Sequence, residues 1–213
     1  MVGTALEQKT LDFHDKGRAV KFGRFLFKFR NFILGPIYLF IIGLSLWESK
    51  NGKAAWSVGP ALICSGELLR LWAMRHIGRS ARTREDKARR LVITGPYVYT
   101  RNPLYLGNHI IMLGFCVLSG LLWFAPIAFG LCFFCYHFIV MYEEELLKQR
   151  FGGEYLRYKS ETLRWIPIPY LGKIFQPAWS KASWRERSTI RGLVIGMGFY
   201  VVKEFVSRFL EGI

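Results

Sequence analysis

No Asp, Glu, Lys or Arg lies between Arg101 and Glu143. A single helix over that stretch would be about twice as long as one bilayer crossing requires. Ser119-Gly120 offers a turn near its middle, because glycine readily leaves helical geometry. The sequence therefore predicts two apolar helices, over about 103–119 and 121–142, that are joined by a tight turn and return through the same membrane.

Two further apolar runs precede this hairpin. Residues 32–47 carry no charge before Glu48, and residues 54–74 carry only Glu67 and Arg70. We therefore expect an all-α fold, a polytopic membrane bundle of four transmembrane helices with interfacial helices. A shorter run at 192–202 fits an interfacial or packing helix better than a crossing, and it is left as an uncertain fifth element.

The basic residues are distributed unevenly between the ends of the apolar runs. The chain has 30 Lys+Arg against 15 Asp+Glu, although 52% of its residues are apolar. Seven basic residues precede the first run, eight lie from 75 to 101, and twelve follow Glu143, against two between the first two runs. The positive-inside tendency predicts an integral protein of the inner, cytoplasmic membrane or its equivalent, with the N-terminus and the active site cytoplasmic.

This distribution also bears on partners and domains. Basic residues at the ends of apolar runs do not form one face of a soluble domain, so we expect membrane lipids and no nucleic acid as partners. We divide the chain into a basic amphipathic segment at 1–31, a membrane core at 32–170 and a basic amphipathic tail at 171–213. The first of these interleaves Phe with Lys and Arg, which fits either a flank of the first span or an interfacial helix. No short apolar run follows the first Met, so no signal peptide is expected.

The cysteines and histidines do not predict a metal site. All four cysteines lie inside apolar runs and are expected to be buried. The histidines at 76, 109 and 137 are widely spaced and lack the pattern of a zinc motif.

Ionisable residues at membrane depth are costly and are therefore candidate functional residues. Glu67 and Arg70 are three residues apart, so they share a helix face and can also simply neutralise one another. Directly after the apolar stretch stand Glu143, Glu144 and Glu145, whose mutual repulsion calls for partners.

Polar residues also collect at the start of the hairpin. Asn102 is a good N-cap and Pro103 suits the first helical position, so a helix should begin there and its free N–H groups can hold an anion. From Arg101 onward one helix face carries a polar stripe that continues through Tyr105, Asn108, His109 and Met112.

In their order and spacing, three motifs resemble those of the integral-membrane methyltransferases that include isoprenylcysteine carboxyl methyltransferase and phospholipid methyltransferases. The match covers about 66–170 and comprises Gly66-Glu67-Leu68-Leu69-Arg70, the stretch from Gly95-Pro96-Tyr97 to Arg101-Asn102-Pro103-Leu104-Tyr105-Leu106-Gly107, and Glu143-Glu144 with Leu147, Phe151-Gly152, Tyr155 and Tyr158, closed by Arg164-Trp165-Ile166-Pro167. Asn102 stands where the family has His, which removes any proton-transfer role there but preserves hydrogen bonding.

The resemblance implies S-adenosylmethionine as the methyl donor and a lipophilic or lipidated acceptor. The cofactor-binding residues it implies are Tyr97, Arg101, Asn102, Pro103, Tyr105, Gly107, Glu143 and Glu144. The two carboxylates suit the amino and ribose groups, the tyrosines suit the sulfonium or adenine, and Arg101 with the helix start suits the carboxylate. Glu67 and Arg70 are the implied catalytic pair, with Glu67 as a base whose strength an arginine partner would reduce.

Two other functions fit the same features. One is an NADPH-dependent membrane reductase of the sterol reductase type, and the other is a non-catalytic membrane scaffold. The acceptor is open between an isoprenylcysteine-type carboxylate, an amino or isoprenoid lipid and a small hydrophobic thiol, and the sequence does not determine the oligomeric state.

Overall fold

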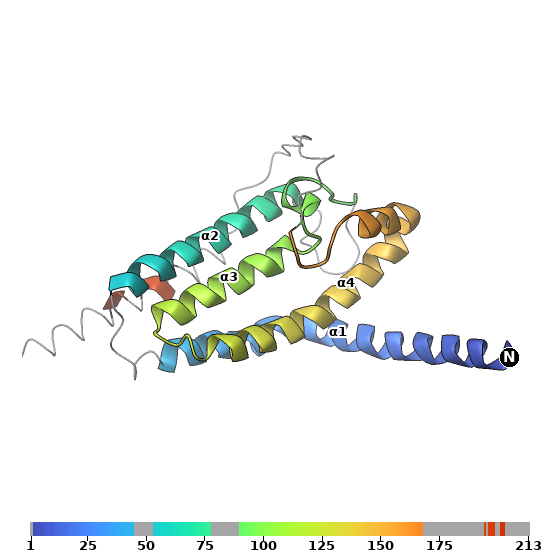
Figure 1. Ribbon diagram of the computed structural model, residues 1–213, viewed down its shortest axis with the longest axis horizontal. Coiled ribbons are helices and arrows are strands. Elements are labelled where there is room, and N and C mark those ends of the chain that lie inside the picture. Colours follow the sequence, from blue (N-terminus) through green and yellow to red (C-terminus); the bar gives the residue numbers. More distant parts are fainter. Residues whose placement is uncertain are drawn as a thin grey trace, which may run out of the picture.

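The fold is all-α over the residues that the computed structural model describes, which are 2–44, 53–77, 90–167 and six positions between 194 and 202. Its helices are α1 (Val2–Leu44), α2 (Lys53–Ile77), the short 3-10 helix η2 (Gly95–Val98), α3 (Pro103–Leu118) and α4 (Ala125–Glu161). No strand occurs within those ranges. Figure 1 shows them as two pairs, α2 beside α3 and α1 beside the first half of α4.

Glycines allow α2 and α3 to pack closely and antiparallel. A Cβ on Gly66 would lie 2.7 Å from the carbonyl oxygen of Gly107, and a Cβ on Gly114 would lie 2.8 Å from that of Gly59. Both glycine pairs are spaced by two helical turns, so they fall on one face of each helix. Such contacts bring backbones together as small residues do between membrane helices.

The pair of α1 and α4 is also antiparallel. A Cβ on Gly23 would meet the carbonyl oxygen of Phe138, and the rings of Phe40 and Phe124 lie 5.1 Å apart near the other end. α1 continues without interruption through Pro36 and across the boundary at residue 31 that the sequence suggested. Pro36 therefore lies well inside a long helix.

The predicted hairpin between α3 and α4 is confirmed, with a longer turn than expected. The turn begins at Ser119, and Gly120 adopts a positive φ of 74° that ends α3. α4 begins at Ala125 and not at residue 121, because Pro126 suits the first turn of a helix and fixes its start.

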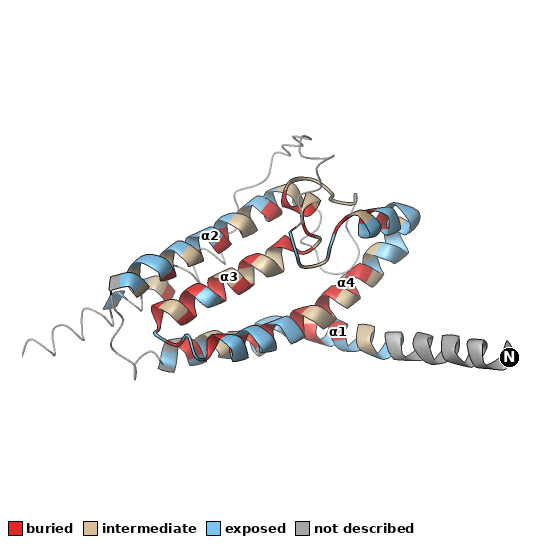
Figure 2. Cartoon of the chain, viewed as in Figure 1, coloured by how far each residue is buried: buried red, intermediate tan, exposed pale blue. Residues whose placement is uncertain are grey.

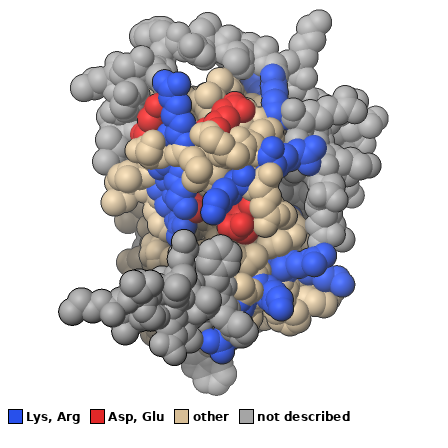
Figure 3. All heavy atoms as spheres, turned by 90° about the vertical axis from the view of Figure 1, so that its right-hand side faces the viewer, with Lys and Arg blue, Asp and Glu red and all other residues tan. Residues whose placement is uncertain are grey.

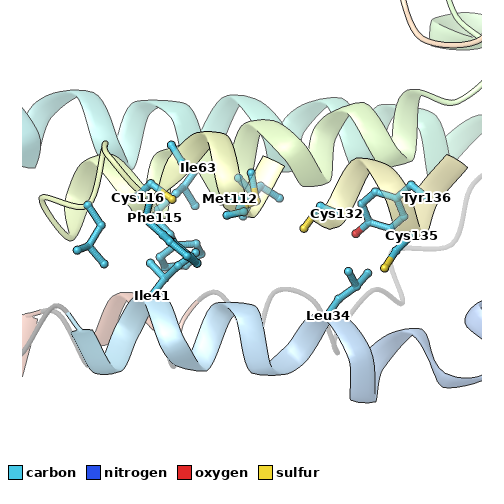
Figure 4. Close-up of a cluster of buried hydrophobic side chains, with 14 of the residues drawn as sticks. Leu34, Ile41, Ile63, Met112, Phe115, Cys116, Cys132, Cys135 and Tyr136 are labelled. Carbon is cyan, nitrogen blue, oxygen red and sulfur yellow. The ribbon is translucent and has the colours of Figure 1, made fainter. Parts of the chain in front are cut away.

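The core lies where the four helices meet. Figure 2 shows buried positions on the inward faces, and Figure 4 shows Ile41 of α1 close to Phe115 of α3, and Leu34 of α1 near Cys135 of α4. Three of the four cysteines are buried, but Cys64 is exposed because it lies on the outward face of α2. Large apolar side chains also face outward, as expected for lipid contact; they include Phe25, Phe32, Leu39, Trp72, Leu122, Trp123 and Phe134.

One of the described helices, α4, is both long and apolar enough to cross a membrane, and α3 is apolar but shorter. This supports membrane association, while crossings at 32–47 and 54–74 stay predictions. Of the run at 192–202 only scattered positions are described, and there a Cβ on Gly196 would lie 3.2 Å from the ring of Phe115. The loop at 78–89 and nearly all of the tail lie outside the described residues.

A break at Gly152 turns the end of α4 back over the start of α3. Gly152 has φ 49° and ψ −120°, which no helical residue adopts. Beyond it Tyr155 and Tyr158 are buried, and residues 162–167 continue toward η2 (Figure 1). The Phe-Gly-Gly sequence therefore places a short helical segment over the first turn of α3.

Candidate active site

Two chain segments join at the end of the bundle where α3 begins. We call residues 97–102 together with 158–164 the clasp. The backbone N–H of Arg101 donates to the carbonyl of Leu163 at 2.9 Å, and the Tyr158 hydroxyl donates to the carbonyl of Tyr97 at 2.7 Å. Thr100 and Asn102 both donate side-chain hydrogen bonds to the carbonyl of Arg164, at 3.0 and 3.1 Å.

A buried carboxylate lies at the centre of the clasp. Glu144 accepts from Nη2 of Arg101 at 2.9 Å and from Nη2 of Arg164 at 2.7 Å, and Nζ of Lys159 lies 3.4 Å away. Burial opposes ionisation of Glu144, but the hydrogen bonds from Arg164 and Arg101 outweigh it and hold its pKa below the usual range. Glu144 is therefore ionised at neutral pH, and it joins α4 to both halves of the clasp.

Arg101 has protein partners on each nitrogen of its guanidinium group. Nε and Nη2 donate to Glu144 at 3.2 and 2.9 Å, while Nη1 donates to the carbonyls of Lys159, at 3.1 Å, and Thr162. An anionic ligand at Arg101, as the sequence predicts, would have to share these donors. The main role of the Arg101 side chain in this geometry is to hold the two segments of the clasp together.

A second polar group links α2, α3 and α4 deeper in the bundle. Nε of Arg70 lies 3.2 Å from Oε2 of Glu67, and Nη1 of Arg70 donates to Oδ1 of Asn108. Asn108 in turn donates to the Tyr136 hydroxyl at 2.9 Å, and its carbonyl accepts from the Tyr38 hydroxyl of α1 at 3.3 Å. The predicted pairing of Glu67 with Arg70 is confirmed, and the pair is tied to every main helix.

Tyr105 and Glu143 lie between this group and the clasp. The Tyr105 hydroxyl donates to Oε1 of Glu143 at 3.0 Å, and the rings of Tyr105 and Tyr136 lie 4.6 Å apart. Burial raises the pKa of Glu143 to about 7, and the hydrogen bond from Tyr105 and the charge of Arg30 offset only part of that effect. Glu143 therefore changes charge near neutral pH, just beyond the apolar part of α4.

The three consecutive glutamates do not face one another. Successive helical residues are rotated by about 100°, which sends neighbouring side chains in different directions. Glu143 accepts from Tyr105, Glu144 binds the arginines, and Glu145 accepts from Gln149 at 3.1 Å. The repulsion expected from their sequence is thus relieved by three separate partners.

The other predicted cofactor-binding residues lie in packing or hydrogen-bonding positions near the start of α3. Asn102 is the N-cap of α3 and Pro103 begins it, as predicted, but the Asn102 side chain bonds to the clasp and not to the helix. Tyr97 is buried within η2. Gly107 lies in the contact between α2 and α3, where a Cβ would come within 2.6 Å of Cγ of Arg70.

Asn108, Tyr136 and Arg164 belong to this site, although they were not among the site residues predicted from the sequence. Asn108 lies on the polar stripe with Tyr105, and Tyr136 shares a helix face with Glu143, so spacing alone indicated both. Arg164 closes the third motif. Its part in binding Glu144 depends on the reversal at Gly152, which spacing does not show.

Comparison with known families identifies the helices that carry this site. The family model described as phospholipid methyltransferase matches residues 54–154, which include α2, α3 and α4 as far as the reversal at Gly152. This confirms the resemblance drawn from the motifs. No curated protein and no solved structure matches the chain significantly.

Proposed function

We propose that this chain transfers a methyl group from S-adenosylmethionine to a lipophilic acceptor in the membrane. Its residues 54–154 match the phospholipid methyltransferase family. The observation that carries the proposal is the placement of Glu143 and Tyr105. Tyr105 contacts the ring of Tyr136 in the deeper polar group, and Glu143 accepts a hydrogen bond from Tyr105 near the end of the bundle where α3 begins.

The chemistry of these residues fits the methyl donor. S-adenosylmethionine supplies an activated methyl group on a sulfonium, and it also carries a cationic amino group. Among the described residues, Glu143 has the Tyr105 hydroxyl as its hydrogen-bond partner and keeps part of its surface exposed. It is thus the carboxylate suited to the amino group, while the ring faces of Tyr97 and Tyr105 suit the sulfonium.

Glu144 and Arg101 then act differently from Glu143. Each neutralises the other within the clasp, so they position the first turn of α3 and the end of α4. The N-terminus of α3, with buried Asn102 and Pro103, is the remaining place for an anionic carboxylate.

The deeper polar group suits the head of the acceptor. Glu67 and Arg70 form a neutral pair, and Asn108 and Tyr136 fix the orientation of the Arg70 side chain. An acceptor held there within an apolar bundle would gain from proximity and from exclusion of water, which suit a displacement at a methyl carbon. An isoprenylcysteine-type carboxylate and an amino or isoprenoid lipid both fit this description.

The charge distribution supports a cytoplasmic site. Figure 3 looks onto the end of the molecule where α3 begins, and Lys and Arg side chains gather there around a few carboxylates. By the positive-inside tendency this end faces the cytosol, where the soluble donor is available.

Binding and labelling together test the proposal. Purified protein in detergent is titrated with S-adenosylmethionine and with NADPH, and membranes containing it are incubated with methyl-labelled donor. We expect binding of the donor and label in the lipid or protein fraction. Glu143→Gln should lose both, whereas the matched control Glu145→Gln, on the neighbouring face, should keep them.

The outcomes separate the three functions. Binding of NADPH alone would favour a membrane reductase and overturn the proposal. A Glu143→Gln protein that inserts and supports the cellular phenotype like the wild type, with no methyl transfer by either, would favour a scaffold.

A further inference from the structure

The side chain of His109 belongs to the polar stripe, but it has no part in the clasp, in the deeper polar group or in the hydrogen bond between Tyr105 and Glu143. His109 lies on α3 one turn below Tyr105, and its side chain is buried, with 6% of its surface exposed. Nδ1 lies 2.8 Å from the carbonyl oxygen of Tyr105. Nε2 is buried and has no hydrogen-bond partner within the described part of the chain.

These two contacts fix the tautomer of His109. A carbonyl oxygen only accepts hydrogen bonds, so Nδ1 must carry the proton that it donates to Tyr105. Nε2 of the neutral ring then carries a lone pair. A buried lone pair that accepts no hydrogen bond is costly in free energy. Such a group in a folded protein calls for an explanation, and one explanation is that it accepts a proton during function.

Aromatic rings from α4 surround this side of the imidazole. The ring centroids of Phe129, Tyr136 and Phe133 lie 4.6, 5.3 and 6.4 Å from that of His109. Phe129 and Phe133 are 48% and 36% exposed, so two of these three rings lie at the surface of the bundle. Ring faces of this kind attract an ammonium group, and side-chain rotation can admit it from the lipid.

We propose that Nε2 of His109 accepts the proton that a methyl acceptor must lose, and hence that the acceptor reacts through a nitrogen that bears hydrogen. The inference rests on the proposed methyl transfer. A carboxylate acceptor needs no base, so the fixed lone pair would be superfluous for one. Glu67 is paired with Arg70 at 3.2 Å, and Glu143 is assigned to the amino group of the donor. This leaves His109 as a neutral base that contacts both Tyr105 and Tyr136.

The step balances in atoms and charge. The N–H bond of the acceptor breaks and its proton forms a bond with Nε2, which leaves the nitrogen lone pair free. That pair forms the new N–C bond while the C–S bond of the sulfonium donor breaks, with its electrons passing to sulfur. The imidazolium later returns its proton to water.

Few titratable groups face His109. On α3 it contacts the backbone of Tyr105, whose hydroxyl is held by Glu143. On α4 it faces the ring of Tyr136, and His137 lies beyond Phe133, with its ring 6.1 Å from that of Phe133. His137 is therefore a matched control, a partly buried histidine of the same region that does not touch His109.

The kinetic test compares His109→Asn with His137→Asn. The Asn amide can keep the donation to the Tyr105 carbonyl but has no base at the place of Nε2. With dodecylamine as acceptor we expect His109→Asn to lower kcat by about 10²- to 10⁴-fold at neutral pH. The loss should shrink as pH rises, because the amine then deprotonates without help. His137→Asn should retain the wild-type rate, and His109→Gln should behave as His109→Asn does.

A loss by the same factor at every pH would indicate a structural role and overturn the proposal, as would an undiminished rate. Efficient transfer to dodecanoate but not to dodecylamine would also overturn it. Unchanged thermal unfolding and unchanged binding of S-adenosylmethionine verify that the variants are folded.

A measurement without turnover separates this inference from the proposed function. Nitrogen NMR of histidine-labelled protein should show an unprotonated Nε2 that His109→Asn removes. Dodecylamine should shift that resonance by donating an N–H hydrogen bond, whereas dodecyltrimethylammonium, which has no such hydrogen, should not. An Nε2 resonance that neither compound moves overturns the role of His109 even if methyl transfer is established. A failure to bind S-adenosylmethionine would instead count against the proposed function.

Discussion

Arg101 and Glu144 lie 43 residues apart in sequence, yet Nη2 of Arg101 is 2.9 Å from Oε1 of Glu144, and both side chains are less than a tenth exposed. The pair joins the segment that leads into α3 to the end of the apolar part of α4. Arg164 completes it from the segment that Gly152 turns back. The end of the bundle where α3 begins is thus held together by ion pairs, while its interior is held together by apolar contacts.

Removing the charge of Glu144 should destabilise the protein strongly. Glu144→Gln leaves two arginines and a lysine facing one another around a buried centre, for which about 3–5 kcal/mol is a reasonable loss. Lys159 and Arg164 are 44% and 26% exposed, so water reduces the loss toward the lower figure. Thermal unfolding in detergent measures it.

The matched control is Glu161→Gln, which removes an ion pair to Arg157, whose side chain is 81% exposed. Such a pair contributes at most about 0.5 kcal/mol, so this variant should unfold almost as the wild type does. Equal losses in the two variants would contradict the assigned role of Glu144.

Acid should weaken the clasp. The pKa of Glu144 is lowered in the folded protein, so the carboxylate contributes stability above its unfolded pKa of about 4.3 and loses it as pH falls further. The melting temperatures of the wild type and Glu144→Gln should therefore differ at pH 7 and converge as pH falls toward 3. A constant difference over that range would show that the stabilisation does not depend on the charge.

The contact between α2 and α3 should not tolerate one added methyl group. In Gly66→Ala the new Cβ would lie 2.7 Å from the carbonyl of Gly107, so the helices must separate. Overpacking of this kind costs about 1–3 kcal/mol, and separation also lengthens the bond from Arg70 to Asn108. Gly130→Ala is the control, because nothing lies within 4 Å of a Cβ there. A stability of Gly66→Ala equal to that of Gly130→Ala would refute this close packing.

The adjacent glycines at 152 and 153 differ in backbone conformation. Gly152 has a positive φ of 49°, whereas Gly153 does not have a positive φ and has no atom within 4 Å of the position of a Cβ. Gly152→Ala should cost about 1–2 kcal/mol and favour a straight α4, in which Tyr158 leaves the clasp and Tyr155 loses its buried position. Gly153→Ala should be neutral or slightly stabilising, because alanine favours helix. Limited trypsin digestion measures this change: cleavage near Lys159 should be faster in Gly152→Ala than in the wild type, and it should not be faster in Gly153→Ala.

The helices themselves follow from local features of the sequence. The uncharged stretch after Arg101, the turn at Ser119 and the start at Asn102-Pro103 predict α3 and the hairpin because each is set by neighbouring residues. The start of α4 was misplaced by four residues, since the turn absorbs Leu121 to Phe124 before Pro126 fixes the helix. Nothing in the composition distinguishes such a turn from one more helical turn.

The site was harder to predict because it depends on tertiary contacts. The motif residues were found, but their spacing did not show that Arg101 and Glu144 bind one another. The binding of Glu144 by both arginines requires the chain to reverse direction at Gly152, because this reversal brings Arg164 next to Glu144. Tertiary contacts also give the two neighbouring glutamates different environments. Glu144 is neutralised by arginines inside the clasp, whereas the Tyr105 hydroxyl is the hydrogen-bond donor to Glu143 among the residues described.

Binding of the methyl donor should release a proton from Glu143. Burial raises the pKa of this carboxyl to about 7, so at pH 7 about half of the molecules hold it protonated. A cationic amino group favours the ionised form, so binding shifts the equilibrium and expels that proton. Affinity for S-adenosylmethionine should therefore rise as pH increases from 6 to 8 and level off once Glu143 is fully ionised. Calorimetry in buffers of different ionisation enthalpy counts the protons, about 0.5 at pH 7. No net release of protons at pH 7, or a release that does not fall as pH rises to 8, would exclude Glu143 as the source.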